Sequence, residues 1–181
     1  MILQVGVHNT VRYVETWQEI ADLIEEVMTN LSVEDPTSPW IAPGENAIFS
    51  FVNARRVNPQ APPWPDNYLF VGVNAKTGYG GLSWYFSPDR GVPADDEIGS
   101  WVWVSNNPEP PDFDPRVVSE PHYPMFYNPE STIPVAHVRA ALEEFCRTGT
   151  GDRPSCISWV KGEVDGRRFD LEPNEGIKRE P

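Results

Sequence analysis

Carboxylates are the most numerous side chains in this sequence that could do chemistry, because 27 of its 181 residues are acidic. A glycoside hydrolase needs two of them, one as an acid and one as a base or nucleophile, beside the scissile bond. The seven tryptophans would suit a sugar-binding cleft. Chance supplies many carboxylate pairs in so acidic a chain, and no spacing singles one out. A carboxylate-dependent sugar hydrolase therefore stays as an alternative without a motif of its own.

Residues that serve as nucleophiles and metal ligands form no catalytic pattern. His8, His122 and His137 are never three or four residues apart, and Cys146 and Cys156 belong to no metal-binding or redox box. The Gly-x-Ser-x-Gly elbow of hydrolases is missing, as are the His-x-Glu and Pro-Cys-x-x-Cys elements of zinc deaminases. The sequence predicts a protein that is not an enzyme and that holds no metal or cofactor.

The charge balance limits the partners of the chain. Fourteen basic side chains leave a net charge of −13, which repels nucleic acid phosphates and anionic membranes and favours basic proteins. Residues 1–7 lack the basic start of a secretory signal, and their apolar run is too short to span a membrane. We expect a cytoplasmic protein that binds neither nucleic acid nor membranes. Cys146 and Cys156 are expected to be buried free thiols, with a disulfide or a redox pair as the alternative.

Hydrophobic periodicity predicts the elements of the N-terminal part. Residues 2–7 alternate as a strand, and Thr16 with Glu19 forms a capping box that opens a helix with an apolar stripe from Trp17 to Leu31. Further strands are predicted in the apolar runs, and a glycine-containing turn at 74–78 joins two of them into a hairpin. These strands are residues 47–52, 68–73, 82–86 and 98–104.

A second helix and a last strand are predicted near the C-terminus. Ser131 or Thr132 could cap the helix, with Pro134 in its first turn and Gly149 as its stop. Arg139 and Glu143 are spaced to pair along this helix. The last strand covers residues 157–160 and is expected to bury Trp159.

The order of these elements predicts an α+β fold. Consecutive strands with two separate helices favour a mostly antiparallel sheet on which two main helices pack. We expect a single domain over residues 1–165 and a polar tail over residues 166–181. The twenty prolines imply long irregular connections, of which the segment 105–132 is the longest and is expected to lack regular structure.

This acidic, aromatic and proline-rich loop is the candidate interface. Loops of such length inside compact domains are commonly functional. Proline stiffening lowers the entropy lost on docking, and an aromatic ring between carboxylates offers an anchor and charge. A merely solvated loop is the alternative, and a helix face is another place for the interface. The candidate contact residues are Glu109, Asp112, Phe113 and Asp114, with Tyr123 in the same loop and Asp95, Asp96 and Glu97 upstream.

Short sequence words point to a known family. They are Ile133-Pro-Val, Ala140-Ala-Leu-Glu-Glu-Phe145, Thr148-Gly149, Arg153-Pro154 and Trp159, with Tyr68-Leu-Phe-Val and Gly80-Gly-Leu upstream. On these words, most of residues 1–165 resembles the first-numbered immunity protein family of bacterial polymorphic toxin systems. The loop from Pro108 to Pro124 is longer and richer in proline than the family pattern, so no contact residue is carried over.

The resemblance implies a function as well as an α+β fold. Members of that family bind and block a cognate toxin domain, commonly a nucleic acid deaminase that acts on cytosine in bacterial DNA. A deaminase must hold nucleic acid on a basic surface, and an acidic protein could cover that surface. We therefore expect a toxin inhibitor whose partner is a basic, deaminase-type toxin domain. An acidic binding domain without an inhibitory role remains the main alternative.

Overall fold

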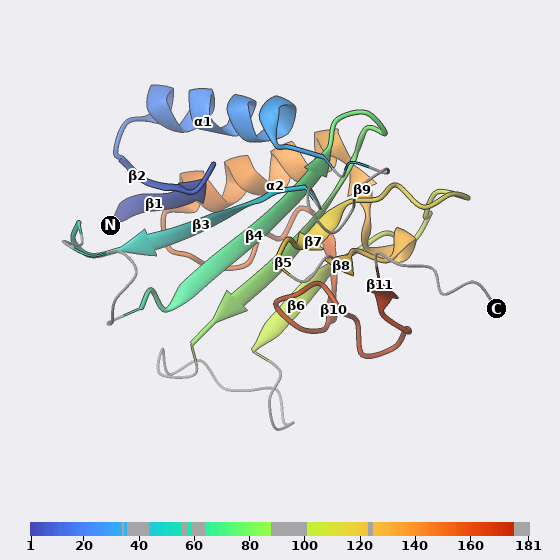
Figure 1. The fold of residues 1–181 in the computed structure, drawn as a ribbon. Helices are drawn as coiled ribbons and strands as arrows, with labels where there is room; N and C mark the ends of the chain where they lie inside the picture. The colour runs from blue at the N-terminus through green and yellow to red at the C-terminus, as the bar shows by residue number, and fades with distance from the viewer. Residues whose placement is uncertain are drawn as a thin grey trace.

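A large antiparallel sheet forms the centre of the computed structural model, which describes residues 1–33, 35, 44–55, 58, 64–87, 101–122 and 125–175. Its strand order is β10-β6-β5-β4-β3-β1-β2, and the short β9 pairs with β5. Two helices pack on one face of the sheet (Figure 1), so the predicted α+β class is confirmed. The strands are β1 (Ile2–Val7), β2 (Thr10–Val14), β3 (Asn46–Val52), β4 (Asn67–Asn74), β5 (Tyr79–Phe86), β6 (Val102–Asn106), β9 (Ile133–Pro134) and β10 (Ser158–Lys161).

The first helix, α1 (Trp17–Asn30), begins as the sequence predicts. The Thr16 hydroxyl accepts the Glu19 amide, and the Glu19 carboxylate accepts the Thr16 amide at 3.0 Å. One stripe of α1 is buried, from Ile20 to Met28. The structure corrects the prediction for Trp17, which was expected in the buried stripe. This residue is 38% exposed, and its ring lies under the Arg147 guanidinium. Cation–π stacking on a second helix replaces the burial that the periodicity predicted.

The second helix, α2 (Val135–Thr148), ends at Gly149 in the left-handed conformation, as predicted. Its start differs, because Pro134 is the N-cap and no side chain caps the first turn. Ser131 and Thr132 are instead buried in the segment that leads to β9. There the Ser131 carbonyl accepts the Ser105 hydroxyl at 2.6 Å. Ser131 and Thr132, which the local sequence favours as helix caps, therefore pack near β6 instead of capping α2.

Ion pairs on α2 also follow tertiary packing. Arg139 bonds to Glu25 of α1 at 2.6 Å rather than to Glu143. Glu143 lies 3.8 Å from Arg147, one turn further along α2. The predicted pair of Arg139 with Glu143 is therefore wrong, because the neighbouring helix offers a closer carboxylate.

A second, small sheet lies on the other face of the large one. It is formed by β7 (Val118–Glu120), β8 (Met125–Phe126) and β11 (Asn174–Glu175), in the order β11-β8-β7. A short 3-10 turn, η2 (Pro129–Ser131), follows β8. The segment 105–132 was expected to lack regular structure, and this expectation is wrong. Buried backbone groups need partners, and the segment finds them both within itself, where β7 pairs with β8, and in the distant strand β11.

Two glycines let the small sheet approach the large one. A Cβ on Gly72 would come within 2.2 Å of the Val118 carbonyl oxygen, and one on Gly81 within 2.5 Å of the Tyr127 ring. Tyr127 is buried and hydrogen-bonds to the Ser83 hydroxyl at 3.0 Å. Burial raises the pKa of Tyr127, although the bond to Ser83 opposes this. The small sheet therefore covers the half of this face nearest the β4–β5 turn.

Residues beyond 165 return to the large sheet. The Arg168 side chain is buried and donates to the Asn106 side chain at 3.0 Å and to the Glu130 carbonyl at 3.1 Å. Two further bonds of 2.8 Å join it to Asp170. Arg168 thus ties the end of β6 and the turn η2 to the segment after β10. The domain boundary at residue 165 stays a prediction.

Candidate partner-binding surface

The predicted contact segment is held at both ends by bonds to distant elements. At its start, the Asn107 amide donates to the Glu130 carbonyl at 2.7 Å, and its side chain donates to the Thr132 carbonyl at 2.7 Å. At its end, the Pro115 carbonyl accepts the Asn74 side chain at 2.9 Å. We call residues 108–114 the acidic tip. Anchored in this way, it protrudes beside the turn between β4 and β5 (Figure 1).

Phe113 is the aromatic residue of the acidic tip. Its side chain is 47% exposed, and its ring meets the edge of the Tyr79 ring at 5.8 Å between centroids. Tyr79 is half-buried at the start of β5. Phe113 therefore has a fixed support on one side and solvent on the other, which is the arrangement of an anchor residue at a protein interface.

The carboxylates of the acidic tip divide into two kinds. Asp114 accepts the Arg116 amide at 2.9 Å and lies 3.7 Å from its guanidinium, which stacks on Phe126. Asp114 therefore stabilises the local backbone through its contacts with Arg116. Glu109 and Asp112 are exposed, and neither forms an ion pair with a described residue.

Several other acidic residues of the structure have basic partners. Arg12 donates to Glu26 at 2.7 Å and lowers the pKa of that carboxyl. Ion pairs also link Glu15 with Arg55, Glu25 with Arg139, both Glu163 and Asp165 with Arg167, and Asp170 with Arg168. Against these pairs, Glu109 and Asp112 offer charge that a cationic partner could still neutralise.

Four of the predicted contact residues lie outside the described part of the chain. They are Asp95, Asp96, Glu97 and Tyr123. The structure therefore places Glu109, Asp112, Phe113 and Asp114 together and leaves the other four as predictions. His122, in the same region, is exposed, and its amide donates to the Glu120 carboxylate at 2.9 Å.

A second aromatic cluster, which is half-buried, was not predicted. It lies on the face of the large sheet turned away from α1 and α2, which we call the open face. Tyr68 and Phe70 of β4 and Tyr85 of β5 are half-buried there, and the Tyr68 ring centroid lies 5.9 Å from that of Phe70 and 5.8 Å from that of Tyr85. We call these three rings the aromatic platform. Strand alternation places Tyr68 and Phe70 on one face, but only the fold decides which face the helices cover.

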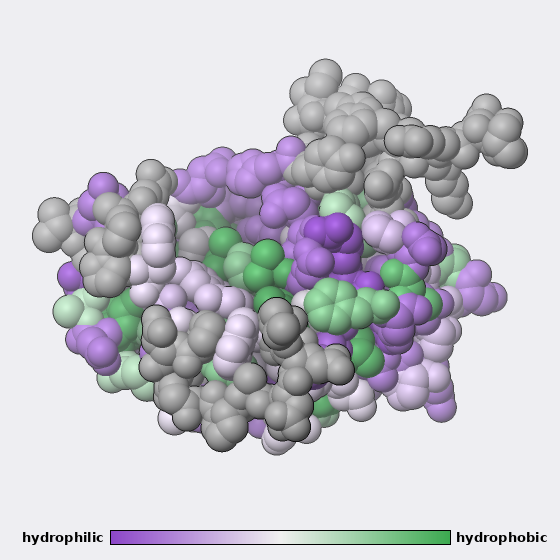
Figure 2. All heavy atoms as spheres, turned by 90° about the horizontal axis from the view of Figure 1, so that it is seen from below, coloured by the Kyte–Doolittle hydropathy of each residue, from purple (hydrophilic) through white to green (hydrophobic). Residues whose placement is uncertain are grey.

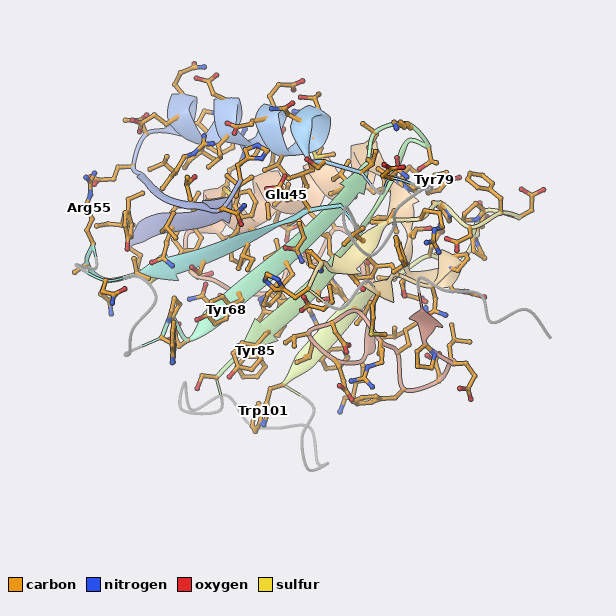
Figure 3. The ribbon with its side chains drawn as sticks, in the orientation of Figure 1. Glu45, Arg55, Tyr68, Tyr79, Tyr85 and Trp101 are labelled. Atoms are coloured by element: carbon orange, nitrogen blue, oxygen red, sulfur yellow. The ribbon has the colours of Figure 1, made fainter. Side chains whose placement is uncertain are left out.

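The view of the molecule from below shows apolar side chains at the surface among polar ones (Figure 2). Tyr79 lies at the turn end of the β4–β5 hairpin, and Tyr68 and Tyr85 lie at its other end (Figure 3). The small sheet packs between them, against Gly72 and Gly81. Both aromatic clusters are therefore associated with the same hairpin.

The cysteines belong to neither cluster. Cys146 is buried, and burial raises its pKa to about 12. Cys156 is exposed, so the prediction that it is buried is wrong. Partial burial and then the hydrogen bond to Glu144 raise the pKa of Cys156 to about 11. Both thiols are free and protonated at neutral pH, so neither is a nucleophile in this state.

Neither a metal site nor a membrane-spanning helix is present among the described residues. No group of three or more histidine, cysteine or acidic side chains there is arranged to hold a metal ion. No helix in the same part of the chain is both long and apolar enough to cross a membrane. These residues include Phe113, an exposed aromatic side chain that is supported by Tyr79 and flanked by carboxylates. Such an arrangement is suited to binding a protein.

The fold is that of an α+β domain with two helices packed on an antiparallel sheet. A family profile described as Immunity protein Imm1 matches residues 8–161 of the 181 residues, and the chain belongs to this family. The resemblance found from short sequence words is thereby confirmed. Membership supports the role of an immunity protein and implies a cognate toxin as its partner. Neither a curated protein nor a solved structure gives a significant match.

Proposed function

We propose that this immunity protein binds a nucleic acid deaminase toxin that acts on cytosine and covers its basic substrate-binding surface. Family membership supports the inhibitory role. The acidic tip is the observation that carries the mode of binding, because Glu109 and Asp112 are exposed without a described ion-pair partner. A surface that holds nucleic acid is basic, so it attracts such carboxylates.

Within the acidic tip, the structure supports distinct parts for the residues. Phe113 is the anchor, Glu109 and Asp112 are the charged contacts, and Asp114 holds the backbone through Arg116. Asp95, Asp96, Glu97 and Tyr123 remain proposed contacts without a structural argument. Because the tip is held before binding, docking loses less conformational entropy than docking of a flexible loop.

The complex forms in the cytoplasm of the producing cell in this proposal, and the protein acts by binding alone. Charge complementarity of this kind raises association rates to about 10⁸–10⁹ M⁻¹s⁻¹ at low salt. Fast association protects a cell that makes both proteins.

The test is reconstitution with the toxin domain encoded beside this chain. Co-expression should restore growth of cells that make the toxin, and the two proteins should co-purify at a fixed stoichiometry. In a deamination assay on single-stranded DNA, activity should fall in proportion to added protein and reach zero at that stoichiometry. Full toxin activity in the presence of excess protein would remove the inhibitor assignment. Turnover by the protein alone, abolished by one carboxylate substitution, would favour the hydrolase alternative.

A further inference from the structure

Phe113 and Phe169 are both exposed aromatic residues, but they differ in the charge beside them. Phe169 is followed by Asp170, whose carboxylate already accepts two hydrogen bonds of 2.8 Å from an arginine. Phe113 is preceded by Asp112 and Glu109, which are exposed and form no ion pair with a described residue. Phe113 thus combines an exposed ring with negative charge that is still available to a partner.

The acidic tip holds this ring in a defined position before any partner binds. Prolines at positions 108, 110 and 111 restrict the backbone of the tip. The Glu109 amide donates to the Asn107 side chain at 3.0 Å and closes a turn at the start of the tip. The Phe113 ring meets the Tyr79 ring at an angle of 84°, and 47% of Phe113 remains exposed. A stiff segment that protrudes from the fold (Figure 1) therefore carries a supported ring.

A protruding ring is best covered by a concave surface, and a deaminase has such a surface at its active site. Enzymes of this class take the target base into a snug pocket, where aromatic or apolar side chains stack on it. A phenylalanine ring is flat and six-membered, as cytosine is. It lacks the exocyclic amino group that the reaction removes, so a deaminase can hold it without turnover. The phosphates of nucleic acid also place negative charge near each base, as Asp112 does near Phe113.

We infer that Phe113 occupies the base pocket of the toxin in place of the target cytosine, with Asp112 and Glu109 in place of neighbouring phosphates; the inference rests on the proposed function. Asp114 has no such part, because it is engaged with Arg116. Stacking of a single ring matters for affinity, since removal of one stacked aromatic from a nucleic-acid site weakens binding about tenfold. Inhibition thus extends from the basic surface of the toxin into the pocket where its chemistry takes place.

Photo-crosslinking locates Phe113 in the complex directly. Phe113→p-azidophenylalanine keeps the ring and adds a small photoreactive group, and the partner is the purified toxin domain encoded beside this chain. A deaminase carries its zinc ligands and its general acid–base glutamate in His-x-Glu and Pro-Cys-x-x-Cys elements. We expect the crosslink, located by mass spectrometry, in the toxin peptides that contain these elements. Phe169→p-azidophenylalanine is the matched control and should give no crosslink there, because Phe169 lies after β10 and outside the acidic tip.

Three further substitutions separate the effect of the ring from that of apolar surface. Phe113→Tyr keeps the ring, Phe113→Leu keeps an apolar side chain without the ring, and Phe169→Leu is the matched control. In a deamination assay on single-stranded DNA, half inhibition should need about tenfold more of the Phe113→Leu variant than of the unaltered protein. Phe113→Tyr should stay within about threefold, and the control should inhibit normally. Thermal unfolding reports whether each variant is folded.

Two results would overturn the inference while the proposed function stands. One is a crosslink from position 113 that lies only outside the peptides with the zinc-binding elements. The other is a Phe113→Leu variant that inhibits as strongly as the unaltered protein. If the unaltered protein neither binds nor inhibits the toxin, the proposed function fails as well. Should Phe113→Leu not fold, the crosslink decides alone.

Discussion

Glu144 shows how one carboxylate fixes the segment after α2. It accepts the Ser155 amide at 2.7 Å, the Cys156 amide at 3.0 Å and the Ser155 hydroxyl at 2.8 Å. Burial favours the protonated acid, but hydrogen bonds from Cys156 and Ser155 outweigh it and lower the pKa of Glu144 to about 2. The ionised form is therefore the one that the fold stabilises.

This pKa predicts a pH dependence. A carboxyl whose folded pKa is depressed contributes stability above its unfolded pKa of about 4.3, and this contribution is lost as the pH falls toward its folded value. Glu144→Gln should thus be less stable than the unaltered protein at pH 7, and the difference should shrink between about pH 5 and pH 2. Urea unfolding at several pH values measures it. A difference that stays constant across this range would contradict the assignment.

Cys156 should be slow to react although it is exposed. With a pKa of about 11, its thiolate is scarce at pH 8. We expect alkylation by iodoacetamide at least about tenfold slower than that of an unperturbed cysteine. Glu144→Gln should speed the reaction, because the carboxylate that opposes ionisation is gone. Mass spectrometry of the modified peptide follows the rate, and buried Cys146 serves as the internal unreactive reference.

At the scale of elements, the two sheets pack closely because Gly72 and Gly81 have no side chain. Gly81→Ala would drive a methyl group into the Tyr127 ring, whereas a Cβ on Gly6 of the same face meets nothing closer than 3.9 Å. We predict that Gly81→Ala costs about 2–4 kcal/mol of the free energy of unfolding, while Gly6→Ala stays within about 0.5 kcal/mol. Chemical denaturation of both variants tests the comparison. Equal stabilities would mean that the small sheet moves away without cost.

The elements with strong local signals were predictable. The α1 capping box, the β4–β5 hairpin and the Gly149 stop are local patterns, and the structure contains all three. The missed elements of the small sheet are short, and one of their pairings joins strands distant in sequence. Strands β7 and β8 pair across a bulge, and β8 also pairs with β11 near residue 175. A strand of two or three residues has too little periodicity to be detected alone.

The missed β1–β2 hairpin has a local cause. Its two turn residues, His8 and Asn9, both adopt positive φ, at 50° and 56°. Such turns favour Asn-Gly, so His-Asn gives a weak signal. The turn is held by the Glu45 carboxylate, which accepts the His8 amide at 2.6 Å. This carboxylate comes from a residue 37 positions away, where no local pattern could indicate it.

The candidate site was likewise predictable from the sequence only in part. The acidic tip could be proposed from composition, since an aromatic between carboxylates in a proline-rich segment is visible in the sequence. Its anchoring by Asn74 and Asn107 could not, because both bond to backbone carbonyls that only the fold brings near. The aromatic platform was missed because it depends on where the small sheet ends.

At the scale of the whole molecule, the acidic tip predicts a salt-dependent interaction. The double change Asp112→Asn with Phe113→Ala should lower the affinity for the toxin at least about tenfold, or roughly 1.4 kcal/mol. The association rate should also depend less on ionic strength, because one steering charge is removed. Stopped-flow association at several salt concentrations measures both effects.

The matched control for this pair is Glu172→Gln with Phe169→Ala, which alters an exposed carboxylate and an exposed ring elsewhere on the surface. It removes the same formal charge. If both double variants lose affinity equally, net charge rather than the acidic tip governs binding. If neither does, the tip is not part of the interface, although the immunity role can stand.

The strand order has a consequence for how the protein is made. In the large sheet, each strand after β1 pairs with at least one strand that precedes it in the chain. The growing sheet thus never has to wait for a later segment before a new strand can add, and it can assemble while the chain leaves the ribosome. The edge of β6 stays open until β10 is synthesised, and in the small sheet β7 waits for β8 and β8 for β11. A protein built in this order forms most of its large sheet during translation, which suits an immunity protein that must be folded when its toxin appears.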